Sequence, residues 1–370
     1  MGAILPVILC GGSGTRLWPV STERAPKPFH DLIETRTLLQ ATTERMQPGP
    51  GRPFLSPVVV CGAPHAALAR RQLKAVGVTP SRLVVEPTAR GTAAAAALAV
   101  EAAREVDPDA TLLIAPADHR IDRPEAFEAA LARGLAAARD RIVLFSAKPD
   151  RAETGYGYIR AGRMRMDGAA EIERFLEKPG RATAEGFLSE GGWGWNAGLF
   201  LTSVQTLDEE LARHASGVQG AVQAAWRAGR RRGVEVRPDA DAFEPCEAVS
   251  LDRAVIERSD RLAVVDCDMG WSDVGCWNSL WRASQRDPRG NLLHGPSRAV
   301  DSSGCLIRSS GPPVLAIGVT GLAIVSAPGG VLVMALDRAQ EVGAHRPEAV
   351  SATAWDPANE AHASVSGPGG

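Results

Sequence analysis

Residues Leu5–Phe29 read LPVILCGGSGTRLWPVSTERAPKPF, and this stretch decides the fold of the chain. It begins with a short apolar run that stops at two glycines, the pattern of a buried parallel strand that leads into a tight turn. Glycines in the turn let the backbone approach a ligand closely, so successive N–H groups are able to hold phosphate oxygens. Arg16 and Lys27 bring two positive charges to the same turn. From the glycines alone, an ordinary strand-to-loop turn is an equally good interpretation.

The composition sets limits on the class of protein. A chain of 370 residues with 45% hydrophobic content is able to bury a sizeable core, and its length suggests two domains or one large domain with an appendage. Because 41 basic residues nearly balance 43 acidic ones, nothing favours nucleic acid or a membrane surface as the main partner. The 6 cysteines show no C-x-x-C spacing, which argues against a zinc site or a disulfide framework and fits a reducing compartment. We therefore expect a cytoplasmic protein without nucleic-acid or membrane partners.

Short strands alternate with helices through the first two thirds of the chain, which predicts a doubly wound, parallel sheet. Further strands are expected at Val58–Val60, Leu83–Val85, Thr111–Ala115, Ile142–Phe145, Ile172–Leu176 and Leu262–Val265. Helices are expected at Leu38–Met46, Pro64–Ala75, Thr92–Val106, Glu125–Ala138 and Val204–Arg230. The basic run Arg230–Arg232 reads as the solvated terminus of the last helix. Sheets of this kind bind ligands at the carboxyl ends of their strands.

The last part of the chain has a different pattern. Past Asn291 no helix is expected, and short apolar pieces recur at turn-separated intervals of about 8 to 10 residues, which predicts a small β domain. Such short coils leave apolar faces that a second copy is able to bury, so we expect a homodimer through this domain. The predicted division is residues 1–288, 289–346 and a tail, 347–370, whose Ala, Ser, Pro and Gly content predicts disorder.

The complete opening string is more specific than its glycines. A Walker A loop requires Lys and Ser or Thr where this chain has Arg16 and Leu17, and a dinucleotide fingerprint requires a glycine at Leu17. By contrast, G-G-x-G-T-R-L-W-P followed by P-K-P-F resembles the signature of the sugar-1-phosphate nucleotidylyltransferases, and its L-W-P form is most similar to the mannose-1-phosphate guanylyltransferases. This resemblance implies a Rossmann-like, mixed-sheet nucleotidyltransferase domain followed by a small domain like a left-handed β-helix.

The resemblance also implies a magnesium site and a nucleotide site. Asp118, after the strand Thr111–Ala115, matches the family's S/A-D-H motif, and Asp273 matches its W-x-D-x-G motif. Each aspartate alone would read as a turn or cap residue, but together they imply Mg²⁺, which prefers carboxylate oxygens. Arg16 is expected to stabilise the transferring phosphoryl group, and Lys27 the departing pyrophosphate. The nucleotide-binding residues implied are Gly11, Gly12, Ser13, Gly14, Thr15, Arg16, Glu86 and Arg90.

Three further motifs imply the sugar-phosphate site. Phe175–Pro179 resembles F-x-E-K-P, Trp195–Phe200 resembles W-N-A-G-x-F, and Ser250–Glu257 resembles S-x-D-x-A-V-x-E. Carboxylate and amide groups suit vicinal hydroxyls, and a lysine ammonium is a point charge suited to phosphate, although Glu177 and Lys178 alone would read as a solvated surface pair. The implied sugar-phosphate-binding residues are Gly157, Glu177, Lys178, Asn196, Asp252 and Trp271, with Lys178 also counted as catalytic together with Arg16 and Lys27.

These motifs imply a Mg²⁺-dependent enzyme that transfers GMP from GTP to α-D-mannose 1-phosphate and releases diphosphate. One departure concerns the base: the family's G-R-N-T-A is here Ala89–Ala93, with Gly91 in place of Asn. The same chemistry with another hexose or heptose 1-phosphate, or with another NTP, therefore stays open. A catalytically silent sugar-nucleotide sensor is the alternative from another class, and it is disfavoured because every charged residue that the mechanism needs is present.

Overall fold

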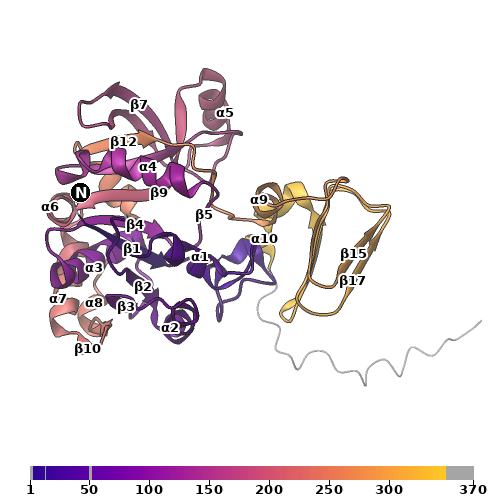
Figure 1. Ribbon diagram of the computed structural model, residues 1–370, viewed down its shortest axis with the longest axis horizontal. Helices are drawn as coiled ribbons and strands as arrows, with labels where there is room; N and C mark the ends of the chain where they lie inside the picture. Colours follow the sequence, from indigo (N-terminus) through magenta and orange to yellow (C-terminus); the bar gives the residue numbers. More distant parts are fainter. Residues whose placement is uncertain (1–2, 13, 50–51, 347–370) are drawn as a thin grey trace, which may run out of the picture.

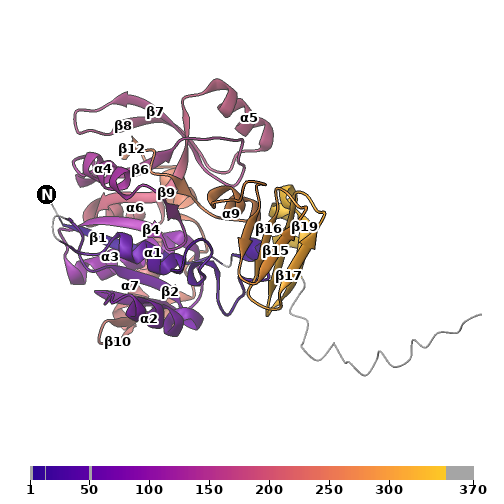
Figure 2. The same ribbon diagram turned by 45° about the vertical axis from the view of Figure 1, so that its right-hand side comes forward.

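The computed structural model describes residues 3–12, 14–49 and 52–346, so Ser13 and the tail expected from Pro347 lie outside the described residues. Within these ranges the chain forms a large α/β body and a smaller β domain beside it (Figure 1). In two views the β domain lies on the side of the body opposite the chain's beginning (Figures 1 and 2).

An 11-stranded sheet forms the centre of the body, and β1 (Ile4–Cys10), one of its central strands, is buried along its whole length. The strand order is β10-β11-β3-β2-β1-β4-β9-β6-β12-β8-β7. Continuous apolar runs such as β1 are typical of strands covered on both faces. The other bounds are β2 (Val58–Gly62), β3 (Arg82–Glu86), β4 (Thr111–Pro116), β6 (Ile142–Ala147), β7 (Tyr158–Met164), β8 (Ala170–Leu176), β9 (Trp193–Ser203), β10 (Arg230–Arg232), β11 (Glu235–Arg237) and β12 (Leu262–Asp266).

The sheet is mixed, as the family resemblance implied, whereas strand–helix alternation alone predicted parallel pairing throughout. β1 pairs in parallel with β2 and β4, but β9 lies antiparallel between β4 and β6. β7 pairs antiparallel with both β8 and β9, and the helix α5 lies between β8 and β9 in the chain, so antiparallel pairing continues through this part of the sheet. The strands β5 (Arg120–Ile121) and β13 (Trp271–Ser272) form a separate, antiparallel two-stranded sheet.

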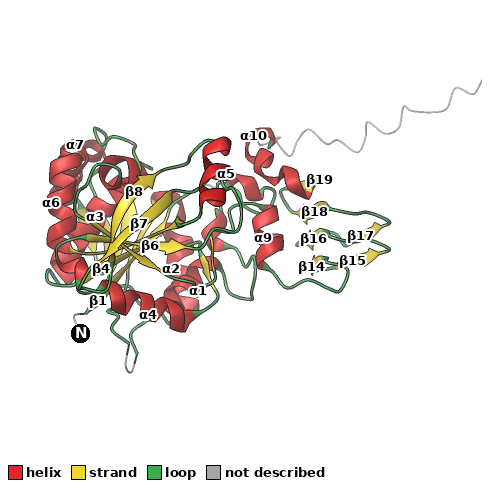
Figure 3. Cartoon of the chain, turned by 90° about the horizontal axis from the view of Figure 1, so that it is seen from above, coloured by secondary structure: helices red, strands yellow, loops and turns green. Residues whose placement is uncertain are grey.

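Helices cover both faces of the sheet, and Figure 3 shows the strands between them. One hydrophobic core joins the sheet to α3 (Gly91–Val106), α6 (Val204–His214) and α7 (Ser216–Ala228). The second core, on the other face, includes α1 (Leu38–Arg45), α2 (Ala66–Ala75) and α4 (Pro124–Gly134). The remaining helices are α5 (Arg181–Glu190), α8 (Ala240–Phe243), a π-helical turn (Asp252–Ile256) and α9 (Trp277–Ala283), with 3₁₀ turns at Thr15–Leu17, Lys27–Phe29, Ala63–His65 and Ala137–Arg139.

Several predicted helix bounds were wrong. The helix expected from Pro64 becomes α-helical only at Ala66, and the one expected to reach Ala138 ends at Gly134. The expected helix Val204–Arg230 is two helices that meet at Ala215. Its basic end is a strand, because Arg231 pairs with Val236 of β11, which itself extends the sheet from β3. Ladder hydrogen bonds to the sheet edge thus replace the predicted solvated helix terminus.

The β domain consists of short, mostly parallel strands. β14 (Leu292–His294), β16 (Leu306–Ser309) and β18 (Leu322–Ala327) pair in parallel, and β19 (Gly330–Ala335) closes this sheet antiparallel. β15 (Ser297–Val300) and β17 (Val314–Ile317) form a second parallel pair. The expectation of no helix here was wrong: a 3₁₀ turn (Leu336–Glu341) and α10 (Val342–His345) follow, because Leu336, Ala339 and Val342 bury one face at helical spacing.

The β domain and the body share a hydrophobic core. Leu17, Val20 and Leu32 from the opening segment belong to the same buried cluster as Leu306 and Val325 of the β domain. Six buried cysteines are free thiols in the part of the chain that the structure describes. Among the described residues, no helix is long and apolar enough to cross a bilayer.

Candidate active site

The glycine loop leaves β1 at the carboxyl edge of the sheet. Gly11 and Gly12 are exposed, and a side-chain carbon at either would meet no described atom within 4 Å, so the backbone faces open space there. Gly14 is different: it has φ 56°, and a side-chain carbon would lie 2.6 Å from Lys27 Cβ. Glycine is needed at that position because the loop packs directly against Lys27. Ser13, predicted to bind the nucleotide, lies outside the described residues.

Arg16 follows the loop in the 3₁₀ turn Thr15–Leu17, and residues distant in sequence hold its guanidinium. Its Nη1 donates to Gln340 Oε1 at 2.6 Å, so the C-terminal segment positions this arginine. A side-chain carbon at Gly275 would collide with the Asp273 carboxylate and lie 2.9 Å from Arg16 Nη2. Arg16 therefore lies beside one of the two predicted metal ligands.

Lys27 connects the two predicted metal ligands. Its Nζ lies 2.8 Å from Asp118 Oδ2, and it also donates to the backbone carbonyl of Asp273. Although burial alone would raise the pKa of Asp118, the Lys27 and His119 charges outweigh it and hold that pKa below its usual range. The structure thus brings together three residues that the sequence places up to 246 positions apart. Lys27 was predicted to meet pyrophosphate, and here its charge is balanced by Asp118.

An aromatic cluster supports the two aspartates. Tyr156 donates from its hydroxyl to Asp273 Oδ1, and burial together with the Asp273 charge raises the pKa of Tyr156. The Trp271 ring lies edge-on to Tyr156 at 5.2 Å, and its Nε1 donates to His119 Nδ1 at 3.1 Å. Trp271 was predicted to contact the sugar, and in the structure its indole N–H orients His119 next to Asp118.

Four of the predicted sugar-binding residues form one cluster. A side-chain carbon at Gly157 would lie 2.7 Å from Glu177 Oε2 and 3.2 Å from Asn196 Cβ, so these three residues are neighbours. Asn196 Nδ2 donates to Asp252 Oδ1 at 2.9 Å. Burial and the Glu177 charge raise the pKa of Asp252 to about 6. Two carboxylates and an amide are thus collected on three separate elements, which suits the recognition of hydroxyl groups.

Lys178 stands at the exposed rim of this cluster. Its Nζ pairs with Glu177 Oε1 at 2.8 Å, and its side chain is 56% exposed while that of Glu177 is 8% exposed. The backbone at Lys178 has φ 48°, a conformation that costs a non-glycine residue on the order of 1 kcal/mol. A hydrogen bond from Lys178 N to Tyr156 O, at 3.2 Å, ties this strained backbone to the residue that holds Asp273.

Glu86, at the end of β3, is a buried carboxylate. Its Oε1 has no hydrogen-bond partner among the residues that the structure describes. Burial raises the pKa of Glu86 to about 7. A buried polar atom without a partner is costly, so this oxygen is available to a ligand that brings a donor to the sheet edge.

The loop after Glu86 is fixed to the segment that leads to Asp252. Arg90 Nη2 donates to Glu244 O at 2.9 Å, and Thr92 Oγ1 accepts from Leu251 N at 2.8 Å. Gly91 has φ 81°, and a side-chain carbon there would collide with the carbonyl of Val249. The substitution of Asn by Gly, noted from the sequence, therefore follows from local packing. Arg90 belongs to this loop, and its Nη2 is used in the hydrogen bond to the Glu244 carbonyl.

The described residues contain no group of three or more His, Cys, Asp or Glu side chains placed to hold a metal ion. Asp118 and Asp273 offer two carboxylates instead, together with an open glycine loop. This donor set fits Mg²⁺, which is usually bound by one or two carboxylates and completes its shell with water and substrate phosphates. It does not fit an all-protein site for zinc.

Sequence reasoning missed two features of this site. Tyr156 received no role from the sequence, and the signal that could have found it is its rarity, since the chain has 2 tyrosines. Gln340 was assigned to the β domain without a role, although it hydrogen-bonds to Arg16. Arg16 and Gln340 are 324 positions apart in the sequence, and no local sequence pattern indicates a contact over such a separation.

Both domains of the chain resemble known protein families. Residues 5–290 match the model of the family described as nucleotidyl transferase, and residues 297–344 match a MannoseP isomerase/GMP-like β-helix domain. The second match agrees with the parallel coils of the C-terminal domain.

Named relatives cover nearly the same part of the chain. The xanthan biosynthesis protein XanB of Xanthomonas campestris is 41% identical over 92% of this chain and 72% of XanB. The mannose-1-phosphate guanylyltransferase of Escherichia coli is 37% identical over 92% of this chain and 72% of the relative. A crystal structure from Thermus thermophilus, named mannose-1-phosphate geranyltransferase, superposes with a TM-score of 0.80 at 33% identity and covers 92% of this chain and 97% of that chain.

Proposed function

Since the chain belongs to the nucleotidyl transferase family, we propose that it transfers GMP from GTP to α-D-mannose 1-phosphate, giving GDP-mannose and diphosphate. The guanylyltransferase name of the Escherichia coli and Klebsiella pneumoniae relatives supports this choice of substrates. The observation that carries the proposal is the meeting, at one sheet edge, of the glycine loop, the Lys27-bridged aspartates and the Glu177–Asn196–Asp252 cluster.

The reaction needs no covalent enzyme group, because an oxygen of the sugar phosphate is itself the nucleophile that attacks the α-phosphorus of GTP. The bond from the α-phosphorus to the bridging oxygen breaks as the new P–O bond forms, and diphosphate leaves with the electron pair. The protein supplies position and charge neutralisation. We assign the loop Gly11–Gly14 to the triphosphate, Arg16 to the charge on the transferring group, and Lys27 to the departing diphosphate.

Asp118 and Asp273 are the residues that would hold Mg²⁺. When bound, the ion neutralises phosphate charge and holds the reacting oxygens in line. Lys27 balances Asp118 in the present structure, and Tyr156 orients the Asp273 carboxylate through its hydroxyl. Both contacts keep the carboxylates in fixed directions before substrate arrives, which reduces the cost of ordering the site.

Glu86 supports guanine as the base. The Watson–Crick edge of guanine carries two adjacent donors, N1–H and the N2 amino group, and a carboxylate presents two acceptors that match them. Adenine has an acceptor at N1, so it would leave the buried Glu86 carboxylate without its partners. The unpartnered Oε1 of Glu86 lies at the end of β3, two strands from the glycine loop in the sheet order.

A grid of four NTPs against several sugar 1-phosphates, with diphosphate release as the readout, tests this proposal. We expect the highest kcat/KM for GTP with mannose 1-phosphate. A higher value for glucose or heptose 1-phosphate, or for another NTP, would keep the reaction and change the substrates. Nucleotide binding without diphosphate release from any pair would indicate the sugar-nucleotide sensor instead.

We further propose a homodimer through the β domain and a location in the cytoplasm. Five of the nine large hydrophobic side chains that are exposed in the described residues lie in this domain: Leu293, Leu315, Ile317, Val331 and Val333. Concentration of exposed apolar side chains in one small domain favours association through it. Buried, reduced cysteines are consistent with a reducing compartment.

A further inference from the structure

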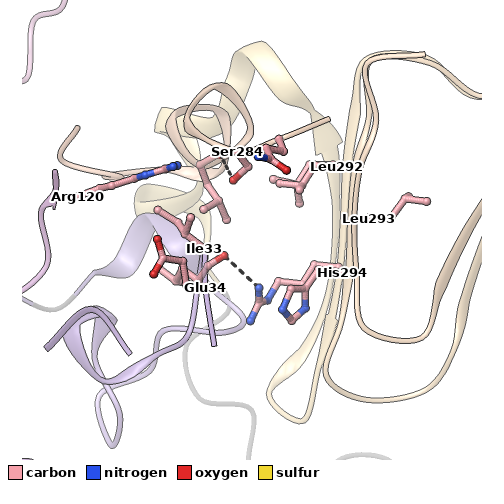
Figure 4. A pocket seen from close by; sticks show the side chains of 12 residues that line it. Ile33, Glu34, Arg120, Ser284, Leu292, Leu293 and His294 are labelled. Atoms are coloured by element: carbon pink, nitrogen blue, oxygen red, sulfur yellow. Dashed lines mark hydrogen bonds between the residues drawn. The ribbon is translucent and has the colours of Figure 1, made fainter. Parts of the chain in front are cut away.

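A second cavity, apart from the site above, lies where the body meets the β domain. It has a volume of about 350 Å³, which is within the range of about 300 to 1,000 Å³ that ligand pockets occupy. Figure 4 shows Leu292 and His294 of β14 facing Ile33 and Glu34 across this space, with Arg120 and Ser284 on a further side. Three separated parts of the chain therefore build its wall.

One side of the cavity is apolar. Side chains from the opening segment, from α9 and from the β domain contribute to it: Leu32, Ile33, Leu280, Leu292 and Leu306. Leu32, Leu280 and Leu306 belong to the core that joins the two domains. This side is thus continuous with a packed interior and is suited to a compact apolar group.

The other side holds buried nitrogen atoms that lack partners. The Arg308 side chain is 4% exposed, and its Nη atoms donate to the backbone carbonyls of Leu32, at 3.3 Å, and Asp31, at 3.0 Å. Within the described ranges, Arg308 Nε has no hydrogen-bond partner, and neither has His294 Nδ1. Because buried polar atoms without a partner are rare and costly, two of them in the wall of one cavity indicate that a polar group belongs there.

The charge of the cavity favours an anion. The carboxylate nearest to Arg308 is that of Asp31, at 3.4 Å, and this side chain is 54% exposed, so water screens it. Glu34 is exposed at the rim, and Arg120, the second guanidinium of the wall, is itself paired with Asp122, so Arg308 carries the positive charge that is available to a ligand. Because its Nε has no partner among the described residues and its carboxylate neighbour is screened by water, this buried guanidinium gains from a charge-assisted bond to a carboxylate or phosphate oxygen.

We propose that this cavity binds a small organic anion, with its carboxylate or phosphate group on Arg308 and His294 and a compact apolar body against the leucines. The position connects such a ligand to catalysis. Arg120 follows Asp118 by two residues, and it pairs with Ser272, the neighbour of Asp273. The strands β5 and β13 thus carry one wall residue of the cavity and lead to both predicted metal ligands.

Calorimetric titration of the full chain with phenyl phosphate, benzoate and inorganic phosphate tests this proposal. We expect phenyl phosphate or benzoate to bind saturably, and inorganic phosphate, which lacks an apolar body, at least 10-fold more weakly. Arg308→Met should weaken binding of the organic anion at least 10-fold, and Ser284→Trp should abolish it by filling the cavity. Arg298→Met is the matched control, since Arg298 is an exposed arginine of the same domain.

An Arg16→Gln variant separates this cavity from the catalytic site, where anions are also expected to bind. Retained binding in Arg16→Gln together with loss in Ser284→Trp supports the proposal. Loss in Arg16→Gln with retention in Arg308→Met, or no binding of either organic anion, overturns it. If Arg308→Met does not fold, as circular dichroism would reveal, the comparison of Ser284→Trp with Arg298→Met decides the question in the same way.

Discussion

Replacing Glu86 by glutamine tests the assignment of the base site, because glutamine keeps the shape and removes the charge. In the bound state an ionised Glu86 would accept charge-assisted hydrogen bonds from guanine, worth about 1.5 to 3 kcal/mol. Losing them should weaken GTP binding by about 10- to 100-fold. Calorimetry with GTP measures this directly, and Glu247→Gln, at an exposed position of the segment that packs on the same loop, is the control.

The raised pKa of Glu86 adds a signature that a merely structural carboxyl group would not show. With a pKa of about 7, the free protein holds Glu86 protonated below neutral pH, so GTP affinity should fall about tenfold for each pH unit below 7. The same raised pKa also makes the free energy of unfolding decrease as the pH rises. Burial raises the pKa of Glu86 from 4.5 to about 7, so the folded protein binds this proton more tightly than the unfolded chain does. The resulting stabilisation is fully present below pH 4.5 and is lost as the pH rises through 7, by about 3 kcal/mol.

The Glu86→Gln variant should lack both pH effects. Its GTP affinity should stay flat between pH 5 and pH 8, and its melting temperature should not fall across that interval as the wild type's does. Unchanged GTP affinity at pH 8, with the pH dependence of binding retained, would refute the placement of Glu86 against the base.

Three further predictions follow from the site and the β domain. Asp273→Asn should abolish turnover at limiting Mg²⁺, and Asp118→Asn should in addition lower the melting temperature, because the buried Lys27 loses its ion-pair partner; normal turnover in either variant would remove that residue from the metal site. Lys178→Ala should reduce kcat/KM for mannose 1-phosphate by about 10- to 100-fold and leave GTP affinity unchanged; the reverse pattern would place this lysine on the wrong substrate. Ile317→Glu should lower the oligomeric state seen by light scattering, whereas Val234→Glu, an exposed control on the body, should not; equal states in both variants would contradict the dimer proposal.

Much of the fold was predictable because its signals are local. The apolar run of β1, its glycine stop and the strand–helix alternation lie within short windows, and the structure confirms the predicted doubly wound body and the C-terminal β domain. The antiparallel placement of β9 was not predictable from local pattern, since strand direction depends on which neighbour it joins. The same holds for Arg230–Arg232, which pair at a sheet edge because β11 lies there to receive them.

The site shows the same division. Asp118, Asp273 and the glycine loop were predicted from motifs, and the structure places Lys27 between the two aspartates. What sequence could not provide are contacts made by side chains that no motif marks. Tyr156 on Asp273 and Gln340 on Arg16 depend on how separate domains pack, and the helical segment that carries Gln340 was read as part of an all-strand domain.

The central claim is that the sugar phosphate itself attacks the α-phosphorus of GTP. Mannose 1-phosphate labelled with ¹⁸O in all of its phosphate oxygens, incubated with GTP, Mg²⁺ and the protein, tests this claim through mass spectrometry of both products. The account predicts GDP-mannose that carries the complete label and diphosphate that carries none. Label in the diphosphate, or GTP consumption without labelled GDP-mannose, would contradict it.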